Sequence, residues 1–277
     1  MTCRVHLGRS GVLPNIDSGT EVWRITMATS IDSPRSFANW IMPWPEFTVN
    51  WSHAALVIVD CQNYTCNPTR GLQKTLSDRH PAVVPYLRKG EVAPYYIQRV
   101  LDIAVPNIRL LLAAFRESQR DVIYTRHGPW LPDGRDMIAR RRKRDVESVV
   151  TSGEPQLWGR GTCEYEIIEA LTPLPAEMVI DKNCSSPFNG TGIDQILRNM
   201  GLETLVMTGV ATDMCVETTA RDAADRGYNV IVVEDATATF FAAHHEAALS
   251  ALARVYAQVW DTHQVLLEIL GMDAGSA

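Results

Sequence analysis

The sequence predicts an α/β fold: a three-layer α/β/α, doubly wound unit built on a mainly parallel, six-stranded sheet. Short apolar runs rich in β-branched residues recur along the chain, and such runs are typical of strands buried on both faces of a sheet. Helical patterns lie between these runs, and alternation of strand and helix indicates a parallel sheet. Because crossovers between parallel strands are right-handed, we expect helices on both faces of the sheet.

Six strands are predicted, the last of them from the weakest pattern. They cover residues 54–60, 121–126, 177–182, 203–209, 229–235 and 255–260. Among the helices between them, residues 95–118 are amphipathic, and a kink is expected near Pro106 because proline removes a backbone donor. Segments 192–201 and 213–227 each end in glycine, which readily adopts the left-handed conformation that follows many helices.

One main domain is predicted over residues 52–277, preceded by an N-terminal arm over residues 1–51. The arm shows no sustained period, and four prolines interrupt it. It is either a tail without fixed structure, with Met27 as an alternative start, or a segment that packs on another subunit. In the second case its contacts are expected from three aromatic residues, Trp40, Trp44 and Phe47.

A long polar connection, residues 127–162, follows the second predicted strand. Its length favours either a lid over an active site or an interface loop. It contains five consecutive cations at residues 140–144. In a chain with an excess of acidic residues, such a run is expected to form a solvated face, and its acidic neighbours are the expected partners. These are Asp136, Asp145 and Glu147.

Charge and composition exclude several classes of protein. The chain has 26 basic and 32 acidic side chains among 277 residues, and this balance argues against a nucleic-acid partner. No apolar run reaches the roughly 18 residues of a spanning helix, and no secretory pattern is present, so we expect a cytoplasmic protein without a membrane partner. Six scattered cysteines lack the spacing of a disulfide scaffold or a zinc site, and most are expected to be reduced thiols.

Three chemically reactive side chains stand at the carboxyl ends of predicted strands, where open α/β sheets bind their ligands. Asp60 closes the first strand, Lys182 closes the third, and Cys215 follows the fourth. Taken singly, each has a common structural explanation as a turn residue, a surface ion-pair partner or a small apolar filler. Together, an acid, a base and a thiol that converge in space favour nucleophilic catalysis.

The position of Cys215 predicts how its thiol is activated. Thr212 or Asp213 is expected to cap the following helix, which places Cys215 in the first turn. There the helix dipole and the nearby Lys182 are expected to lower the pKa of the thiol. Asp60 is expected to take the thiol proton and pass it to a leaving amine.

Three sequence blocks resemble, in order, those of the isochorismatase-like cysteine hydrolase superfamily, which includes N-carbamoylsarcosine amidases, ureidoacrylate amidohydrolases, biuret hydrolases and nicotinamidases. They are ALVIVDCQN, VIDKNCSSPFNGTGIDQILRNMG and LVMTGVATDMCVETTARDAADRGYNVIVVEDATATF, and the similarity runs from about residue 52 to the end. The resemblance implies a catalytic triad of Asp60, Lys182 and Cys215. It also implies a cis peptide between Val210 and Ala211, and an oxyanion hole formed by the N–H groups of Ala211 and Cys215.

The function implied by the resemblance is that of a cysteine-dependent amidohydrolase. Such an enzyme cleaves a C–N bond of a small linear amide or of a carbamoyl or ureido compound through a thioester and releases ammonia or an amine. The block CSSPFNGTGID and the PWP of the arm resemble the ureido and biuret branch more than they resemble nicotinamidase. The resemblance implies no cofactor and a homo-oligomer, either a dimer or a tetramer.

Two other functions remain open on the same fold. Hydrolysis of a vinyl ether of the isochorismatase type needs no nucleophilic cysteine, so the presence of Cys215 speaks against it. A non-catalytic binding protein is the other alternative, and the complete triad speaks against that one.

No metal site is predicted. Nicotinamidase-type members of the superfamily carry an Asp-x-His motif just after the second strand, where this chain has Thr125, Arg126 and His127. The segment Asp78-Arg79-His80 has the required spacing but precedes the long helix, which is the wrong place for this motif.

The predicted substrate-binding residues come from the segments that follow the strands. They are Gln62, Asn63, His127, Trp130, Ser186, Phe188 and Asn189. His127 is expected to hydrogen-bond a polar substrate or to serve as a structural donor, and the two aromatic residues to cover a planar group or to pack in the core. His244 and His245, on a later helix, are expected to face solvent.

Overall fold

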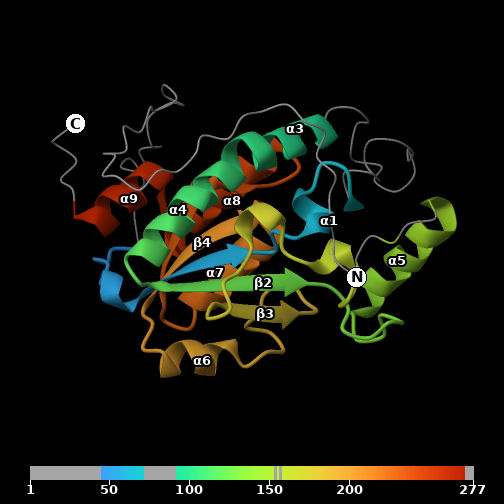
Figure 1. The fold of residues 1–277 in the computed structure, drawn as a ribbon, viewed down its shortest axis with the longest axis horizontal. Helices are drawn as coiled ribbons and strands as arrows, with labels where there is room; N and C mark the ends of the chain where they lie inside the picture. The colour runs from blue at the N-terminus through green and yellow to red at the C-terminus, as the bar shows by residue number, and fades with distance from the viewer. Residues whose placement is uncertain (1–44, 72–91, 153–154, 156–157, 272–277) are drawn as a thin grey trace. The chain divides into compact units, whose positions relative to one another are not determined.

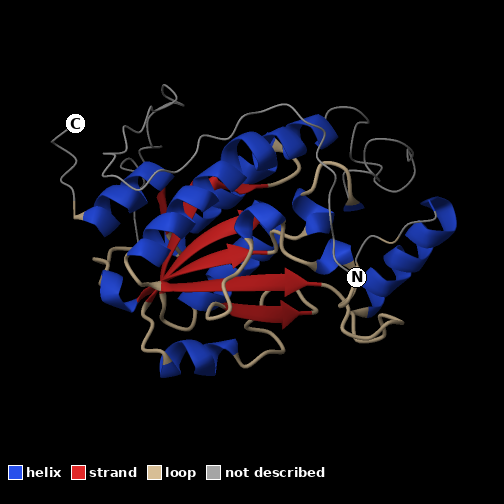
Figure 2. Ribbon diagram, viewed as in Figure 1, coloured by secondary structure: helices blue, strands red, loops and turns tan. Residues whose placement is uncertain are grey.

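The computed structural model describes residues 45–71, 92–152, 155 and 158–271. Six strands form one sheet in the order β3-β2-β1-β4-β5-β6, and every neighbouring pair is parallel (Figures 1 and 2). The strands are β1 Ala54–Val59, β2 Asp121–His127, β3 Met178–Lys182, β4 Thr204–Val210, β5 Asn229–Ala238 and β6 Gln258–Trp260. The predicted α/β class and six-stranded sheet are confirmed.

The helices of the described residues lie between and after the strands. The α-helices are α1 Asn63–Cys66, α3 Val92–Gln98, α4 Val105–Glu117, α5 Ala139–Ser152, α6 Ile193–Asn199, α7 Glu217–Ala224, α8 Ala242–Val255 and α9 Thr262–Leu270. Short 3-10 turns are η2 Trp51–His53, η4 Cys163–Tyr165 and η5 Glu169–Leu171, and the π-helical segments are η3 Arg99–Ala104 and η6 Thr212–Val216.

The long amphipathic helix predicted over residues 95–118 is divided in the structure. The π-helical segment η3 separates α3 from α4, so the irregularity precedes Pro106. Pro106 itself lies in the first turn of α4, where its missing N–H and fixed φ are well tolerated.

The central strand β1 shows why the fold has three layers. All six of its residues are buried, as expected for a strand covered on both faces. Leu56 and Ile58 pack in one core cluster with residues of α4 and α9. Ala55, Val57 and Val59 pack in a second cluster with residues of α6, α7 and α8. Helices therefore cover both faces of the sheet (Figure 1).

The long connection after β2 contains a helix that the sequence pattern did not reveal. Helix α5 has no buried apolar stripe among its described side chains, since Val146, Val149 and Val150 are all exposed. Without such a stripe the usual helical signal is missing. Asp136, a predicted partner of the cationic run, instead accepts hydrogen bonds from the backbone N–H groups of Trp130 and Leu131. Whether the connection acts as a lid or an interface stays a prediction.

The last residues of the predicted arm pack on the domain. Phe47 packs against the core of its own chain. Whether the arm also contacts another subunit stays a prediction. The side-chain amide of Gln258 donates to the backbone oxygens of Pro45 and Phe47 at 2.9 and 3.0 Å. Residues 1–44, which include Met27, Trp40 and Trp44, lie outside the described residues.

Two further expectations concern cysteines and membranes. Cys61, Cys66, Cys184 and Cys215 carry free thiols, whereas Cys163 is disulfide-bonded. In the described part of the chain, no helix combines the length and the apolar character that crossing a bilayer requires.

Candidate active site

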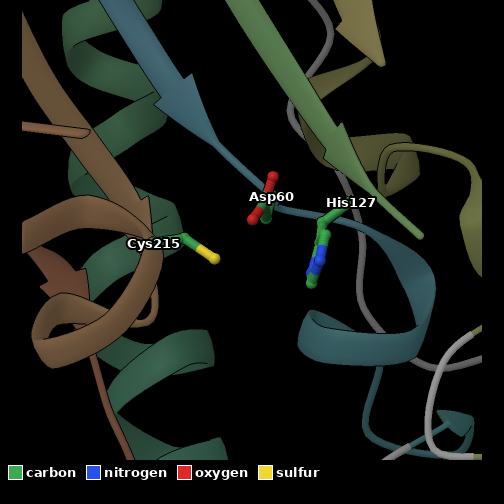
Figure 3. Close-up of side chains that lie close together, drawn as sticks. All are labelled: Asp60, His127 and Cys215. Atoms are coloured by element: carbon green, nitrogen blue, oxygen red, sulfur yellow. The ribbon is translucent and has the colours of Figure 1, made fainter. Parts of the chain in front are cut away.

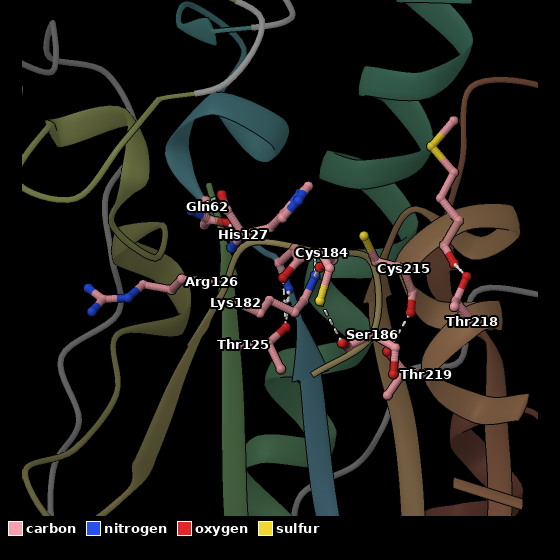
Figure 4. Close-up of polar contacts among 12 residues, drawn as sticks. Gln62, Thr125, Arg126, His127, Lys182, Cys184, Ser186, Cys215, Thr218 and Thr219 are labelled. Carbon is pink, nitrogen blue, oxygen red and sulfur yellow. Dashed lines mark hydrogen bonds and ion pairs between the residues drawn. The ribbon is translucent and has the colours of Figure 1, made fainter. Parts of the chain in front are cut away.

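The polar side chains predicted to be reactive meet at the centre of the sheet's carboxyl edge. β1 and β4 are neighbours there, and the strand order runs outward from them in both directions, which makes their carboxyl ends the topological switch point. Asp60 follows β1. His127 ends β2, Lys182 ends β3, and Cys215 lies in η6 just after β4 (Figure 4). Four segments far apart in sequence thus contribute to one buried polar site.

Asp60 is fixed in an unusual backbone conformation. Its φ of 51° is in the left-handed region, which few residues other than glycine adopt. Its N–H donates to the Thr125 hydroxyl at 3.2 Å, and that hydroxyl donates to the Oδ1 atom of Asp60 at 2.6 Å. The Asp60 carbonyl oxygen accepts a hydrogen bond from the Thr65 hydroxyl at 2.7 Å. Strand β2 therefore holds the carboxylate, and helix α1 holds the backbone of the same residue.

Lys182 supplies the counter-charge. Its side chain is fully buried, and its Nζ atom donates to Oδ2 of Asp60 at 2.7 Å and to the backbone oxygen of Cys184 at 3.2 Å. Burial acts to lower the pKa of this ammonium group, but the charges of Asp60 and Cys215 outweigh it, so the pKa lies above its ordinary value. Lys182 is therefore a permanent cation at the centre of the site.

A glycine allows β4 to approach β1 where the two strands end. Gly209 has a φ of 102°, and a Cβ atom built on it would lie 2.1 Å from the backbone oxygen of Val59. The next peptide bond, between Val210 and Ala211, is cis, at the position that the family resemblance gives for it. The Ala211 oxygen then accepts the N–H groups of Met214 and Val216, which closes the turn that carries Cys215.

Cys215 is buried and faces the acid and the imidazole. Its sulfur, a carboxylate oxygen of Asp60 and a ring nitrogen of His127 all lie within 4.8 Å of one another, and the Sγ atom points toward the other two residues (Figure 3). Burial raises the pKa of the thiol to about 12, with the charge of Asp60 adding to the rise and that of Lys182 opposing it. The expected lowering of this pKa is wrong, because desolvation exceeds the effect of the lysine.

His127 offers a neutral imidazole to the same space. Burial is the main reason that its pKa falls to about 3, and the charge of Lys182 lowers it further. Its backbone is held by Gln62, which accepts from the His127 N–H at 2.7 Å and donates to the His127 oxygen at 3.3 Å. Among the described residues, no hydrogen-bond partner is found for the ring nitrogens. The ring is therefore free to bind a ligand.

The carboxylate, imidazole and thiol also form a set of metal-ligand types. Their donor atoms are close enough together to contact one ion. The buried ammonium of Lys182, 2.7 Å from Asp60, repels a cation there and already neutralises the carboxylate. The arrangement suits a proton transfer between Cys215 and Asp60 better than it suits a metal. Asp78-Arg79-His80 lies outside the described residues.

Two of the predicted substrate-binding residues have their side-chain amides occupied. Gln62 is fully buried, and it donates to the backbone oxygen of Tyr165 at 2.7 Å in addition to its bonds with His127. The Nδ2 atom of Asn63 donates to the backbone oxygen of Cys163 at 2.9 Å. Gln62 and Asn63 therefore hold the segments around the site.

The predicted residues after β3 are also structural in their contacts. The Ser186 hydroxyl accepts the Phe188 N–H at 3.2 Å, and Phe188 packs in the second core cluster beside Tyr228. Asn189 is exposed and donates to Asp222 at 3.0 Å. Of the two roles expected for Phe188, covering a planar group or packing in the core, the structure shows packing in the core.

Trp130 lies after β2 and is half-buried. The guanidinium of Arg160 stacks over its ring at 4.9 Å, and its indole N–H is buried without a partner among the described residues. Among the predicted substrate-binding residues, His127 has a ring nitrogen within 4.8 Å of the Cys215 sulfur.

A second buried histidine supports the turn before Cys215. His245 is 3% exposed, so the expectation that it faces solvent is wrong, whereas His244 is exposed. The Nε2 atom of His245 lies 2.8 Å from Arg99, and its Nδ1 atom lies 2.9 Å from the Thr212 hydroxyl. Because arginine can only donate, Nδ1 of the neutral ring carries the proton and donates to Thr212. The expectation that Thr212 or Asp213 caps the helix is wrong, because Ala211 is the N-cap residue and no side chain caps it. The contacts of Thr125 and Thr212 join distant segments, so sequence patterns do not reveal them.

This chain is similar to known proteins in sequence and in fold. The isochorismatase domain model matches residues 54–264. A ureidoacrylate amidohydrolase from Methylorubrum extorquens is 46% identical over 82 residues, which are 30% of this chain and only 33% of that protein. Nicotinamidase 3 of Arabidopsis thaliana is 33% identical over 168 residues, 60% of this chain and 79% of that protein. The crystal structure of a cysteine hydrolase from Pseudomonas syringae pv. phaseolicola 1448A has a TM-score of 0.65 and 28% identity, covering 83% of this chain and 99% of that one.

Proposed function

Because the chain belongs to the isochorismatase family of hydrolases, we propose that it is a cysteine-dependent amidohydrolase. Its substrate is a small linear amide, or a carbamoyl or ureido compound, whose C–N bond is not a peptide bond. The observation that carries this proposal is the burial of Asp60, Lys182 and Cys215 around one point at the carboxyl edge of the sheet. The relatives named as amidohydrolase and nicotinamidase support the class of bond.

The first step is attack by sulfur. The Cys215 thiol is protonated in the resting enzyme because its pKa is about 12. Asp60 accepts the thiol proton as the Sγ atom forms a bond to the carbonyl carbon of the substrate. Lys182 stays protonated and stabilises the negative charge shared by the carboxylate and the sulfur.

The second step expels the nitrogen. The N–H groups of Ala211 and Cys215, at the turn after β4, are proposed to bind the oxyanion of the tetrahedral intermediate. The C–N bond breaks, and the proton held by Asp60 passes to the leaving ammonia or amine. Water, deprotonated by Asp60, then attacks the Cys215 thioester, which regenerates the thiol and releases the acid product. No cofactor takes part in this scheme.

The substrate class follows from the polar character of the site and from the relatives. His127 provides an uncharged hydrogen-bonding ring beside Cys215, which suits an amide or ureido group. The similarity to a ureidoacrylate amidohydrolase supports the ureido class. A cytoplasmic location and a homo-oligomeric state, as a dimer or tetramer, remain parts of the same proposal.

A screen for ammonia release tests the function. N-carbamoyl amino acids, ureidoacrylate, biuret, nicotinamide and simple aliphatic amides are offered to the wild type, to Cys215→Ala and to Asp60→Asn. We expect release from at least one ureido or carbamoyl compound by the wild type and loss of at least about 1,000-fold in both variants. Retention of activity in Cys215→Ala would exclude the covalent route.

A further inference from the structure

One cation of the run at residues 140–144 is set apart from the others. Arg141 is half-buried, whereas the four cations beside it are exposed. The segment before it is anchored to the site, because Met137 packs against Tyr64, a residue of α1. The prediction that this run forms a solvated face therefore holds for four of its five cations, and not for Arg141.

A second contact fixes the same segment to the end of β3. Asn183, which directly follows Lys182, donates from Nδ2 to the backbone oxygen of Asp136 at 3.1 Å. The start of α5 is thus attached to both α1 and the end of β3, the elements that surround the proposed active site. Arg141 lies in the first turn of this helix.

The charge of Arg141 reaches two buried groups of the site. Burial and the charges of Asp60 and Cys215 raise the pKa of Tyr64, and Arg141 opposes this rise. Burial is the largest cause of the lowered pKa of His127, and Arg141 adds to it. Arg141 therefore lies within electrostatic range of Tyr64 and His127.

Two polar groups at this place lack partners. Within the described ranges no carboxylate pairs with Arg141, although the exposed Lys143 of the same helix lies 3.8 Å from Glu147. The imidazole of His127 is only 4% exposed and is likewise without a hydrogen-bond partner in this part of the chain. Buried polar groups are normally paired, so the imidazole points to a bound ligand. The half-buried Arg141, whose charge acts on the same ring, is a cation available to that ligand.

We propose that Arg141 binds a carboxylate on the substrate, at the end remote from the reacting carbonyl, while His127 binds the uncharged ureido or amide end. The preferred substrates are then small ureido or carbamoyl compounds that carry one carboxylate. This assignment rests on the proposed function. The guanidinium fork matches a carboxylate with two parallel hydrogen bonds, and the neutral imidazole donates from one nitrogen and accepts at the other.

A binding experiment tests the assignment without relying on turnover. Two ligands are compared, 3-ureidopropionate and N-propylurea. N-propylurea has a methyl group in the place of the carboxylate of 3-ureidopropionate. Their dissociation constants are measured by calorimetry on three proteins. These are Cys215→Ala, the double variant Cys215→Ala/Arg141→Gln and, as the matched control, the double variant Cys215→Ala/Arg142→Gln. Thermal melts of each protein verify that the variants are folded.

We expect 3-ureidopropionate to bind Cys215→Ala at least about ten-fold more tightly than N-propylurea, as a charge-assisted hydrogen bond would give. Arg141→Gln should abolish this difference, and Arg142→Gln should keep it. Equal binding of the two ligands, absence of binding by both, or the same loss in Arg142→Gln would overturn the proposal. Charge-dependent binding without ammonia release by the wild type would instead contradict the proposed function alone.

Discussion

The Nζ atom of Lys182 lies 2.7 Å from the Oδ2 atom of Asp60, and both side chains are almost completely removed from solvent. A buried ion pair adds little to stability when it is complete, but removing one partner leaves an uncompensated charge in a medium of low dielectric constant. The pair is therefore a sensitive probe of how the site is built.

Replacing Lys182 should destabilise the protein strongly. In Lys182→Met the Asp60 carboxylate is left buried without its counter-ion, and we expect a loss of about 3 kcal/mol or more in the free energy of unfolding. Urea unfolding measures it. The double variant Asp60→Asn/Lys182→Met should recover part of the loss, and a double variant no more stable than Lys182→Met would show that the ion pair is not the cause.

Thr125 should act through Asp60. Its hydroxyl has one proton, which it donates to Oδ1 of Asp60 at 2.6 Å, and so it holds the carboxylate toward Cys215. We expect Thr125→Val to lower kcat by about 10- to 100-fold with little change in KM, because hydrogen bonds to charged groups contribute about 1.5–3 kcal/mol. Thr125→Ser should restore most of kcat; equal losses in both variants would contradict a role for the hydroxyl.

Alkylation of Cys215 should keep accelerating at high pH. Because its pKa is about 12, the thiolate fraction in the free protein grows about ten-fold per pH unit at least up to pH 10. Iodoacetamide labelling at several pH values, read at the Cys215 peptide by mass spectrometry, measures this slope. A plateau between pH 7 and 8 would instead indicate a thiol with a lowered pKa.

Stability should fall in mild acid because of His127. The unfolded chain binds a proton on this residue below about pH 6.5, whereas the folded protein does so only near its lowered pKa of about 3. Within this interval the wild type should lose up to about 1.4 kcal/mol per pH unit. The melting temperature of His127→Gln should fall less steeply than that of the wild type as the pH is lowered. The melting temperature of His263→Gln, a change at an exposed histidine, should follow the wild type. The same pH dependence in all three proteins would contradict the assignment.

Gly209 should not tolerate a side chain. A Cβ atom would lie 2.1 Å from the Val59 oxygen, and the φ of 102° is unfavourable for any other residue. We expect Gly209→Ala to destabilise the protein by about 2 kcal/mol or more. Gly227→Ala is the control for the φ penalty alone, since Gly227 has a φ of 87° but no atom within 4 Å of the position that a Cβ would take. An equal loss in both variants would exclude the close approach as the cause.

The strands and the meeting of Asp60 with Lys182 were predictable from the sequence for a simple reason. Each strand is an apolar run, and in a parallel sheet the carboxyl ends of all strands lie on one edge. Helix α5 was not predictable, because its valines are exposed and it buries no apolar stripe. Its charged run gave no sign that Arg141 is half-buried or that residues 136 and 137 attach the start of the helix to distant segments.

Other features depend on depth of burial, which sequence position does not reveal. Cys215 stands in the first turn after β4 as expected, but the direction of its pKa shift was wrong because desolvation exceeds the effect of Lys182. Gln62 is next to the site in sequence, yet its amide is bonded to the backbone of His127 and Tyr165. Which polar group faces the substrate is set by these long-range contacts.

The central claim is that Cys215 forms a covalent thioester with the substrate during turnover. The most direct measurement is acid quenching of the enzyme within the first turnovers on the best ureido or carbamoyl substrate, followed by peptide mass spectrometry. We predict an adduct on the Cys215 peptide with the mass of the substrate's acyl part, with no adduct on the Cys61, Cys66 or Cys184 peptides. Continued turnover by Cys215→Ala, with no adduct on the wild-type Cys215 peptide, would contradict the account.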